Sequence, residues 1–258
     1  MSVEHLSLHS RDWRLYATCL ATECRPGWSW QAWPAGTPIE VVGFAKYDRD
    51  LLAFPAPFPV ALYLSLARNT QRTGARLLEK CLASGLEAQP QGFTRVPAAV
   101  ETQLFDGLEN VLAAVVFSHT AIEAFANWTI PEDWEYVQDR QDGRRRKVYS
   151  SGQIERHLSL EVKLDQILPK VHSVPSPKGT AIWGDYVWLR RLRNRLVHLK
   201  SPDIGPSNPE QADKLVWTAL LEPKVHTAPE VAMQLIEHYL PADRPRWARE
   251  FWSRLSGE

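Results

Sequence analysis

One arginine-rich segment holds the residue types that proton transfer and phosphate binding require. Residues 188–200 contain four arginines, one lysine, one asparagine and one histidine, and no acid. If this segment is helical, its leucines fall on one side, and Arg193 lies at the boundary between the apolar and the polar side. The polar side chains fall on the other side: Arg190, Arg191, Asn194, Arg195 and His198. Clustered like charges repel each other, so we expect an anion such as a phosphate to visit this face.

Within this segment, Arg193, Asn194 and His198 have a spacing suited to catalysis on a phosphate. An imidazole with an ordinary pKa near 6.5 can transfer protons at cytosolic pH. The arginine fork can hold phosphate oxygens without losing its charge. Asn194 precedes His198 by one helical turn, so its amide can orient the imidazole or donate to a substrate. His198 is the only histidine that follows an arginine with four to six residues between them.

The remainder of the chain predicts a mainly α protein. Prolines and short β-prone runs, Trp13–Leu20, Trp28–Trp33 and Ile39–Phe44, predict a small accessory region with short strands and then one helix at residues 1–97. Residues 98–258 predict a helical bundle with one inserted β-hairpin at about 132–151, turning at Asp142-Gly143. The expected helices cover residues 59–85, 98–128, 151–167, 180–200, 208–221, 229–240 and 246–255.

Composition and missing motifs narrow the classes of protein. The formal net charge is zero, so nucleic-acid binding requires local patches. Three cysteines without a metal-ligand spacing fit a reduced cytosol, and we expect a cytoplasmic protein with no metal and no cofactor. No signal peptide is evident, and the apolar runs are too short for a membrane span. A Gly-x-Ser-x-Gly nucleophile motif is absent.

The motif resembles that of a known superfamily. Arg193-Asn194-x-x-x-His198 on an amphipathic helix is similar to the signature of HEPN domains (higher eukaryotes and prokaryotes nucleotide-binding domains). The upstream stretch 118–127, Ser-His-Thr-Ala-Ile-Glu-Ala-Phe-Ala-Asn, resembles the first helix of several HEPN families. Residues 158–169 resemble the HEPN helix that lies between this first helix and the motif helix. The resemblance covers roughly residues 98–222. It does not extend to the N-terminal third of the chain, and it implies no role for the hairpin.

The resemblance implies a fold, an activity and partners. It implies a HEPN-like bundle and a metal-independent endoribonuclease that cleaves RNA through attack of the 2′-OH, leaving a 2′,3′-cyclic phosphate. The setting would be a toxin–antitoxin or antiviral defence system, with an antitoxin or regulatory protein as a partner. A symmetric homodimer would bring two motif helices together. The implied catalytic residues are Arg193, Asn194 and His198. On the upstream helix, His119, Glu123 and Asn127 recur every four residues and share a stripe, from which we expect the Glu123 carboxylate to support Arg193.

Several alternatives stay open. His198 is also compatible with a non-catalytic HEPN module that dimerises or binds a nucleotide or a protein partner. Glu123 is also compatible with an ordinary surface acid. Eight cations are expected to contact RNA, four on the motif segment and four on the hairpin, but a solvated helix face and a charge-protected strand edge would have the same composition. These cations are Arg190, Arg191, Arg195, Lys200, Arg144, Arg145, Arg146 and Lys147.

Overall fold

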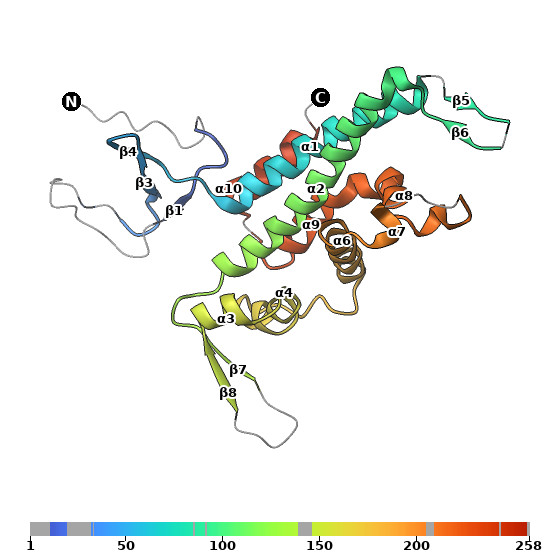
Figure 1. Ribbon diagram of the computed structural model, residues 1–258. Coiled ribbons are helices and arrows are strands. Elements are labelled where there is room, and N and C mark those ends of the chain that lie inside the picture. Colours follow the sequence, from blue (N-terminus) through green and yellow to red (C-terminus); the bar gives the residue numbers. More distant parts are fainter. Residues whose placement is uncertain are drawn as a thin grey trace. The chain divides into compact units, whose positions relative to one another are not determined.

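The computed structural model of the chain is mostly helical, with few and short strands (Figure 1). Helices make up 62% of the chain, which confirms the mainly α prediction. The structure describes residues 11–19, 32, 34–84, 86–90, 92–138, 146–204, 209–242 and 244–256. The predicted strand Trp28–Trp33, except for residue 32, and the hairpin turn Asp142-Gly143 lie outside these ranges.

The chain divides into two compact units, and the division differs from the predicted boundary at residue 97. Unit 1 comprises residues 1–62 and 245–258, and unit 2 comprises residues 63–244. The first long helix therefore belongs mainly with the bundle, because it packs along the next helix. The C-terminal helix belongs with the N-terminal strands, because the Trp247 ring lies 5.3 Å from that of Phe58. Proline punctuation located the start of the helix but gave no information about its packing partner.

Unit 1 contains two antiparallel strand pairs and a C-terminal helix. Strand β1 (Ala17–Cys19) pairs with β2 (Pro38–Glu40), and β3 (Val42–Tyr47) pairs with β4 (Asp50–Pro55). The predicted strands at 13–20 and 39–44 are confirmed as β1, β2 and the start of β3, whereas β4 was not predicted. Phe58 is 2% exposed and stacks on Tyr16, so the core of this unit joins β1 to α10 (Arg246–Ser256).

Unit 2 is organised around helix α2 (Glu101–Trp128), which packs against α6 (Ala181–Val197) and α9 (Ala228–Glu237). A single 3-10 turn, η2 (Ala98–Val100), precedes α2. Residues 98–128 are long and apolar enough to cross a membrane by length and composition, and half of the apolar window is buried inside the protein. Fully buried side chains from these helices form the core, including Ile122, Phe125, Tyr186 and Leu189, together with Tyr239 just after α9.

Helix α1 (Pro59–Ala83) crosses α2 closely at two glycines. A Cβ atom at Gly74 would lie 2.8 Å from Val111 Cγ2 and 3.0 Å from the Gly107 carbonyl oxygen. A Cβ atom at Gly107 would lie 2.7 Å from Leu78 Cδ2. The absence of both Cβ atoms therefore sets how closely these helices approach.

This crossing predicts that Gly74→Ala destabilises the protein by ~1–3 kcal/mol, because the added methyl group overpacks against backbone. Gly184 in α6 is the matched control, since nothing lies within 4 Å of a Cβ atom placed there. Gly184→Ala is expected to stabilise by ~0.5–1 kcal/mol through helix propensity. Urea denaturation measures both values. Equal effects of the two substitutions would contradict the close crossing.

The predicted hairpin is confirmed in its strands. Strand β7 (Glu135–Gln138) pairs antiparallel with β8 (Lys147–Ser150), so Glu135 faces Ser150 and Gln138 faces Lys147. A second short pair, β5 (Glu87–Ala88) and β6 (Thr94–Arg95), precedes η2, in the stretch between the helices predicted at 59–85 and 98–128.

The helix predicted at 151–167 is wrong as a single element. Leu158 is extended (φ −101°, ψ 139°) and ends α3 (Ser151–His157). Ser159 then begins a new helix, because its side chain accepts a hydrogen bond from the Val162 amide at 3.3 Å. The segment continues as α4 (Leu160–Val162), a π-helical turn η3 (Lys163–Ile167) and α5 (Leu168–Val171).

The elements after α6 are shorter than predicted. They are α7 (Ser201–Ile204), the 3-10 helix η4 (Pro209–Lys214), α8 (Val216–Leu221), the 3-10 helix η5 (Pro223–Thr227) and α9. Residue 208, where the helix predicted at 208–221 begins, lies outside the described residues.

Candidate functional site

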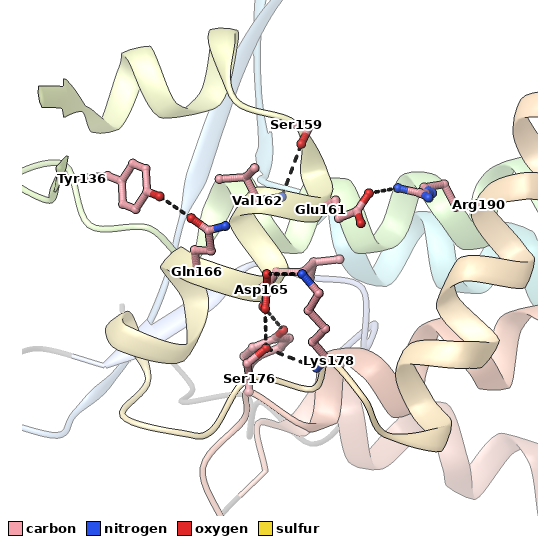
Figure 2. Close-up of polar contacts among 11 residues, drawn as sticks. Tyr136, Ser159, Glu161, Val162, Asp165, Gln166, Ser176, Lys178 and Arg190 are labelled. Carbon is pink, nitrogen blue, oxygen red and sulfur yellow. Dashed lines mark hydrogen bonds and ion pairs between the residues drawn. The ribbon is translucent and has the colours of Figure 1, made fainter. Parts of the chain in front are cut away.

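Helix α6 carries the arginine-rich motif and is fixed at its start and along one face. The Thr180 side chain caps it by accepting a hydrogen bond from the Trp183 amide at 3.4 Å. The preceding loop is held to η3, because Asp165 accepts hydrogen bonds from Ser176 Oγ at 2.7 Å and Lys178 Nζ at 3.1 Å (Figure 2). The buried face is apolar: Trp183, Tyr186, Leu189, Leu192 and Leu196. The opposite face is therefore free to hold the polar residues of the motif.

The motif residues lie at the C-terminal end of α6. The helix ends at Val197, three residues before the predicted end, and His198 is the C-cap residue with φ −122° and ψ 67°. The side chains of Asn194 and His198 are exposed, and the His198 backbone N–H donates to the Asn194 carbonyl oxygen at 3.0 Å. Arg193 Nη1 donates to Asn194 Oδ1 at 3.1 Å. The Asn194 amide thus orients the Arg193 guanidinium, where the sequence suggested the imidazole.

A buried histidine on α2 faces the same arginines. His119 is 6% exposed. Burial, and then the charges of Arg193 and Arg190, lower the pKa of His119 to about 4. His119 Nδ1 and Arg193 Nε are both buried and form no hydrogen bond within the described part of the chain. Two polar atoms on packed helices therefore stand without a partner at this site.

One turn and two turns further along α2, Glu123 and Asn127 face a buried lysine. Lys163 is 2% exposed, and its Nζ donates to Asn127 Oδ1 at 2.7 Å and to the Glu155 carbonyl oxygen at 3.0 Å. Burial lowers the pKa of Lys163, and the Glu123 carboxylate opposes that effect. Lys163 begins the π-helical turn η3, a conformation that is frequent at functional sites.

We call this group of residues the polar seam. It consists of His119, Glu123 and Asn127 on α2, Lys163 on η3, and Arg190 and Arg193 on α6. The periodicity of α2 predicted a shared stripe of His119, Glu123 and Asn127, but Glu123 was expected to support Arg193. Its charge instead acts on Lys163 and Tyr186, while His119 lies beside Arg193. Sequence reasoning missed Lys163, whose only signal was a lysine within an apolar helical run.

Two of the arginines expected to contact RNA form ion pairs within the protein. Arg190 of α6 and Glu161 of α4 point toward each other and pair (Figure 2). Arg195 donates through Nη2 to Asp203 Oδ1 at 2.7 Å and through Nε to Asp203 Oδ2 at 3.3 Å. Arg195 also donates to the Lys214 carbonyl oxygen. Arg195 therefore joins the end of α6 to α7 and η4, which gives it a structural role that the sequence did not predict.

The other expected RNA contacts are exposed or undescribed. Arg191 and Lys200 have exposed side chains. On the hairpin, Arg146 and Lys147 are exposed, and Lys147 Nζ lies 4.5 Å from the centre of the Tyr149 ring. Arg144 and Arg145 lie outside the described residues. The hairpin is attached to η3 through a hydrogen bond from the Tyr136 hydroxyl to Gln166 Oε1 (Figure 2).

No protein-family model, curated protein or solved structure matches this chain. The site is therefore defined by its own geometry. Within the described ranges, no group of three or more His, Cys, Asp or Glu side chains is arranged to hold a metal ion. The chemical groups that the polar seam and the end of α6 do supply are guanidinium donors, one buried and one exposed imidazole, two amides, one ammonium and one carboxylate.

Proposed function

We propose that the chain is a metal-independent endoribonuclease of HEPN type, with a HEPN-like bundle at 98–222 and a role as a toxin or antiviral effector. The observation that carries the proposal is the position of Arg193. Its guanidinium donates to the Asn194 side chain, its charge lowers the pKa of the buried His119, and it lies five residues before His198, whose side chain is exposed. These are the groups that RNA cleavage through the 2′-OH requires.

Each residue has a defined part in this mechanism. The Arg193 fork holds non-bridging oxygens of the scissile phosphate as negative charge develops on them. The exposed His198 imidazole transfers a proton to or from the ribose or the leaving oxygen. Asn194 keeps the guanidinium in place. In-line cleavage uses two proton-transfer groups, and we propose that a symmetric homodimer supplies the second His198 across a shared cleft.

The test is cleavage of single-stranded RNA by the purified chain in the presence of EDTA. We expect fragments that end in 2′,3′-cyclic phosphates. The His198→Ala protein, purified in the same way, is the control for contaminating ribonucleases. Equal cleavage by the two proteins would refute the enzymatic proposal.

A specific observation favours a second candidate function, that of a non-catalytic interaction module. A pocket of about 470 Å³ between α2 and α8 is lined by Phe105, Leu108, Glu109, Leu112 and Trp217. Phe105 is 64% exposed and Trp217 is 36% exposed, and exposed aromatic side chains of this kind mark protein-binding surfaces. Expression in a host cell separates the two functions. The enzyme is expected to be toxic and its His198→Ala variant harmless, whereas a module is expected to give the same growth with both.

A further inference from the structure

Two buried polar atoms of the polar seam lack a hydrogen-bond partner within the described part of the chain. His119 Nδ1 on α2 and Arg193 Nε on α6 belong to helices that pack against each other. A buried polar atom without a hydrogen bond destabilises a protein by ~1–3 kcal/mol. Such atoms persist at sites where a ligand supplies the missing partner.

The charges around His119 make an anion the ligand that fits. From α6, Arg190 and Arg193 both act on the imidazole. The acid of the seam and the nearby Glu161 have other partners. Glu161 of α4 pairs with Arg190, and Glu123 of α2 acts on Lys163 of η3 and on Tyr186. The positive charge of Arg193 is therefore not balanced by an ion pair in the described part of the chain, where its hydrogen bond goes to the neutral amide of Asn194.

We propose that His119 and Arg193, with Arg190 at the edge, bind a phosphate group in the polar seam. The Arg193 guanidinium would donate two hydrogen bonds to phosphate oxygens, and the His119 imidazole on α2 would donate one more. His119 is thereby assigned as a binding residue of the site. The assignment of the phosphate to RNA rests on the proposed function, whereas the binding of a phosphate group does not.

Phosphate binding at this position is coupled to protonation of His119. In the free protein, burial and the two arginines keep the imidazole neutral by lowering its pKa to about 4. An anion beside the ring stabilises the imidazolium form, so binding raises the pKa of His119. By linkage, the anion binds more tightly as the pH falls toward that raised pKa.

Sulfate is a suitable first probe, because its own charge stays constant across the range in which histidines titrate. We expect sulfate to raise the pKa of His119, measured by NMR of the assigned imidazole in the wild-type protein, by about one pH unit or more. His172 is the internal control. Burial alone lowers its pKa, and its Nε2 already bonds Thr129 Oγ1 at 2.9 Å. The proposal is overturned if sulfate leaves the His119 titration unchanged or shifts both histidines equally.

Variants separate the site from general electrostatic attraction. Arg193→Gln and His119→Gln are each expected to weaken sulfate binding by about tenfold. Arg156→Gln removes an exposed charge of α3, outside the site, and is expected to leave binding within about twofold. Equal losses for Arg156→Gln and Arg193→Gln would indicate general electrostatic attraction to the protein and would overturn the site.

Two further ligands identify the source of the phosphate. We expect a short single-stranded oligoribonucleotide to bind the His198→Ala protein, which does not cut it, and to lose about tenfold in affinity when Arg193→Gln is added. A nucleoside monophosphate is expected to bind more weakly than the oligoribonucleotide. Binding of the monophosphate alone would support the phosphate site and overturn its assignment to RNA. Sulfate binding without any RNA cleavage by the wild type would support this site while the proposed function fails.

Discussion

His198→Ala is expected to lower the rate of RNA cleavage by about 10²- to 10⁴-fold, the usual contribution of a group that transfers protons in the transition state. Arg193→Ala is expected to lower it by about 10²- to 10³-fold, because the charge on the phosphate loses its donor. Arg193→Lys retains the charge without the two-pronged geometry and is expected to fall between Arg193→Ala and the wild type. Single-turnover cleavage of a labelled RNA measures these rates.

Matched surface residues provide the controls. Arg156 and His157 are both exposed in the last turn of α3. His157→Ala and Arg156→Ala are expected to change the cleavage rate by less than about threefold, in keeping with the small effects of isolated surface charges. Thermal unfolding of every variant checks that the fold is retained. The mechanism is wrong if His157→Ala and His198→Ala lower the rate equally.

Mixing the wild type with an excess of His198→Ala tests the shared cleft. A mixed dimer holds one intact His198, so its cleft lacks the second proton-transfer group. We therefore expect cleavage per wild-type chain to fall as the excess of His198→Ala grows. If cleavage per wild-type chain stays constant although mixed dimers form, each site is complete within one chain, and the proposed role of the homodimer is wrong.

Local features of the chain could be predicted well because they depend on neighbouring residues. Pro59 begins α1, and the expected amphipathic pattern of α6 places its leucines in the core. The stripe of His119, Glu123 and Asn127 follows from helical periodicity alone. Such patterns fix which side chains share a face, so they predicted the α2 side of the site.

Pairings between distant segments could not be predicted in the same way. Helical periodicity predicted that His119, Glu123 and Asn127 share one face of α2. Which residues that face contacts depends on the placement of α4 and η3, and the break in the helix at Leu158 sets that placement. Glu123 therefore acts on Lys163, and Arg193 lies beside His119. The same reason explains the domain boundary, since the close passage of Gly74 by Gly107 is a long-range feature. Helical periodicity specifies a face, and only tertiary packing specifies what that face meets.

The ion pair of Arg195 with Asp203 is the clearest example of a pairing that the sequence did not predict. We expect removal of the Asp203 carboxylate to lower the stability of the protein strongly. The Asp203 side chain has 0% exposure and pairs with Arg195. Its carboxylate also accepts hydrogen bonds from the backbone amides of Val216 at 2.8 Å and Lys200 at 3.4 Å. Asp203→Ala leaves these donors without an acceptor, so we expect the free energy of unfolding to fall by ~2–4 kcal/mol. Chemical denaturation measures the loss. Asp213→Ala, at an exposed position in η4, is the control and is expected to change stability by less than about 0.5 kcal/mol.

The effect of Asp203 is expected to depend on pH with a defined sign. Hydrogen bonds from Arg195, and then from the Val216 amide, hold the pKa of the Asp203 carboxyl below its ordinary value. A pKa that is lower in the folded than in the unfolded state stabilises the protein above the unfolded pKa, near 3.9 for aspartate. That stabilisation is lost as the pH falls through the folded pKa. The difference in stability between the wild type and Asp203→Asn should therefore be constant at neutral pH and shrink below about pH 4. A difference that stays constant into the acid range would mean that the Asp203 charge does not hold the end of α6, and that Arg195 is available to RNA after all.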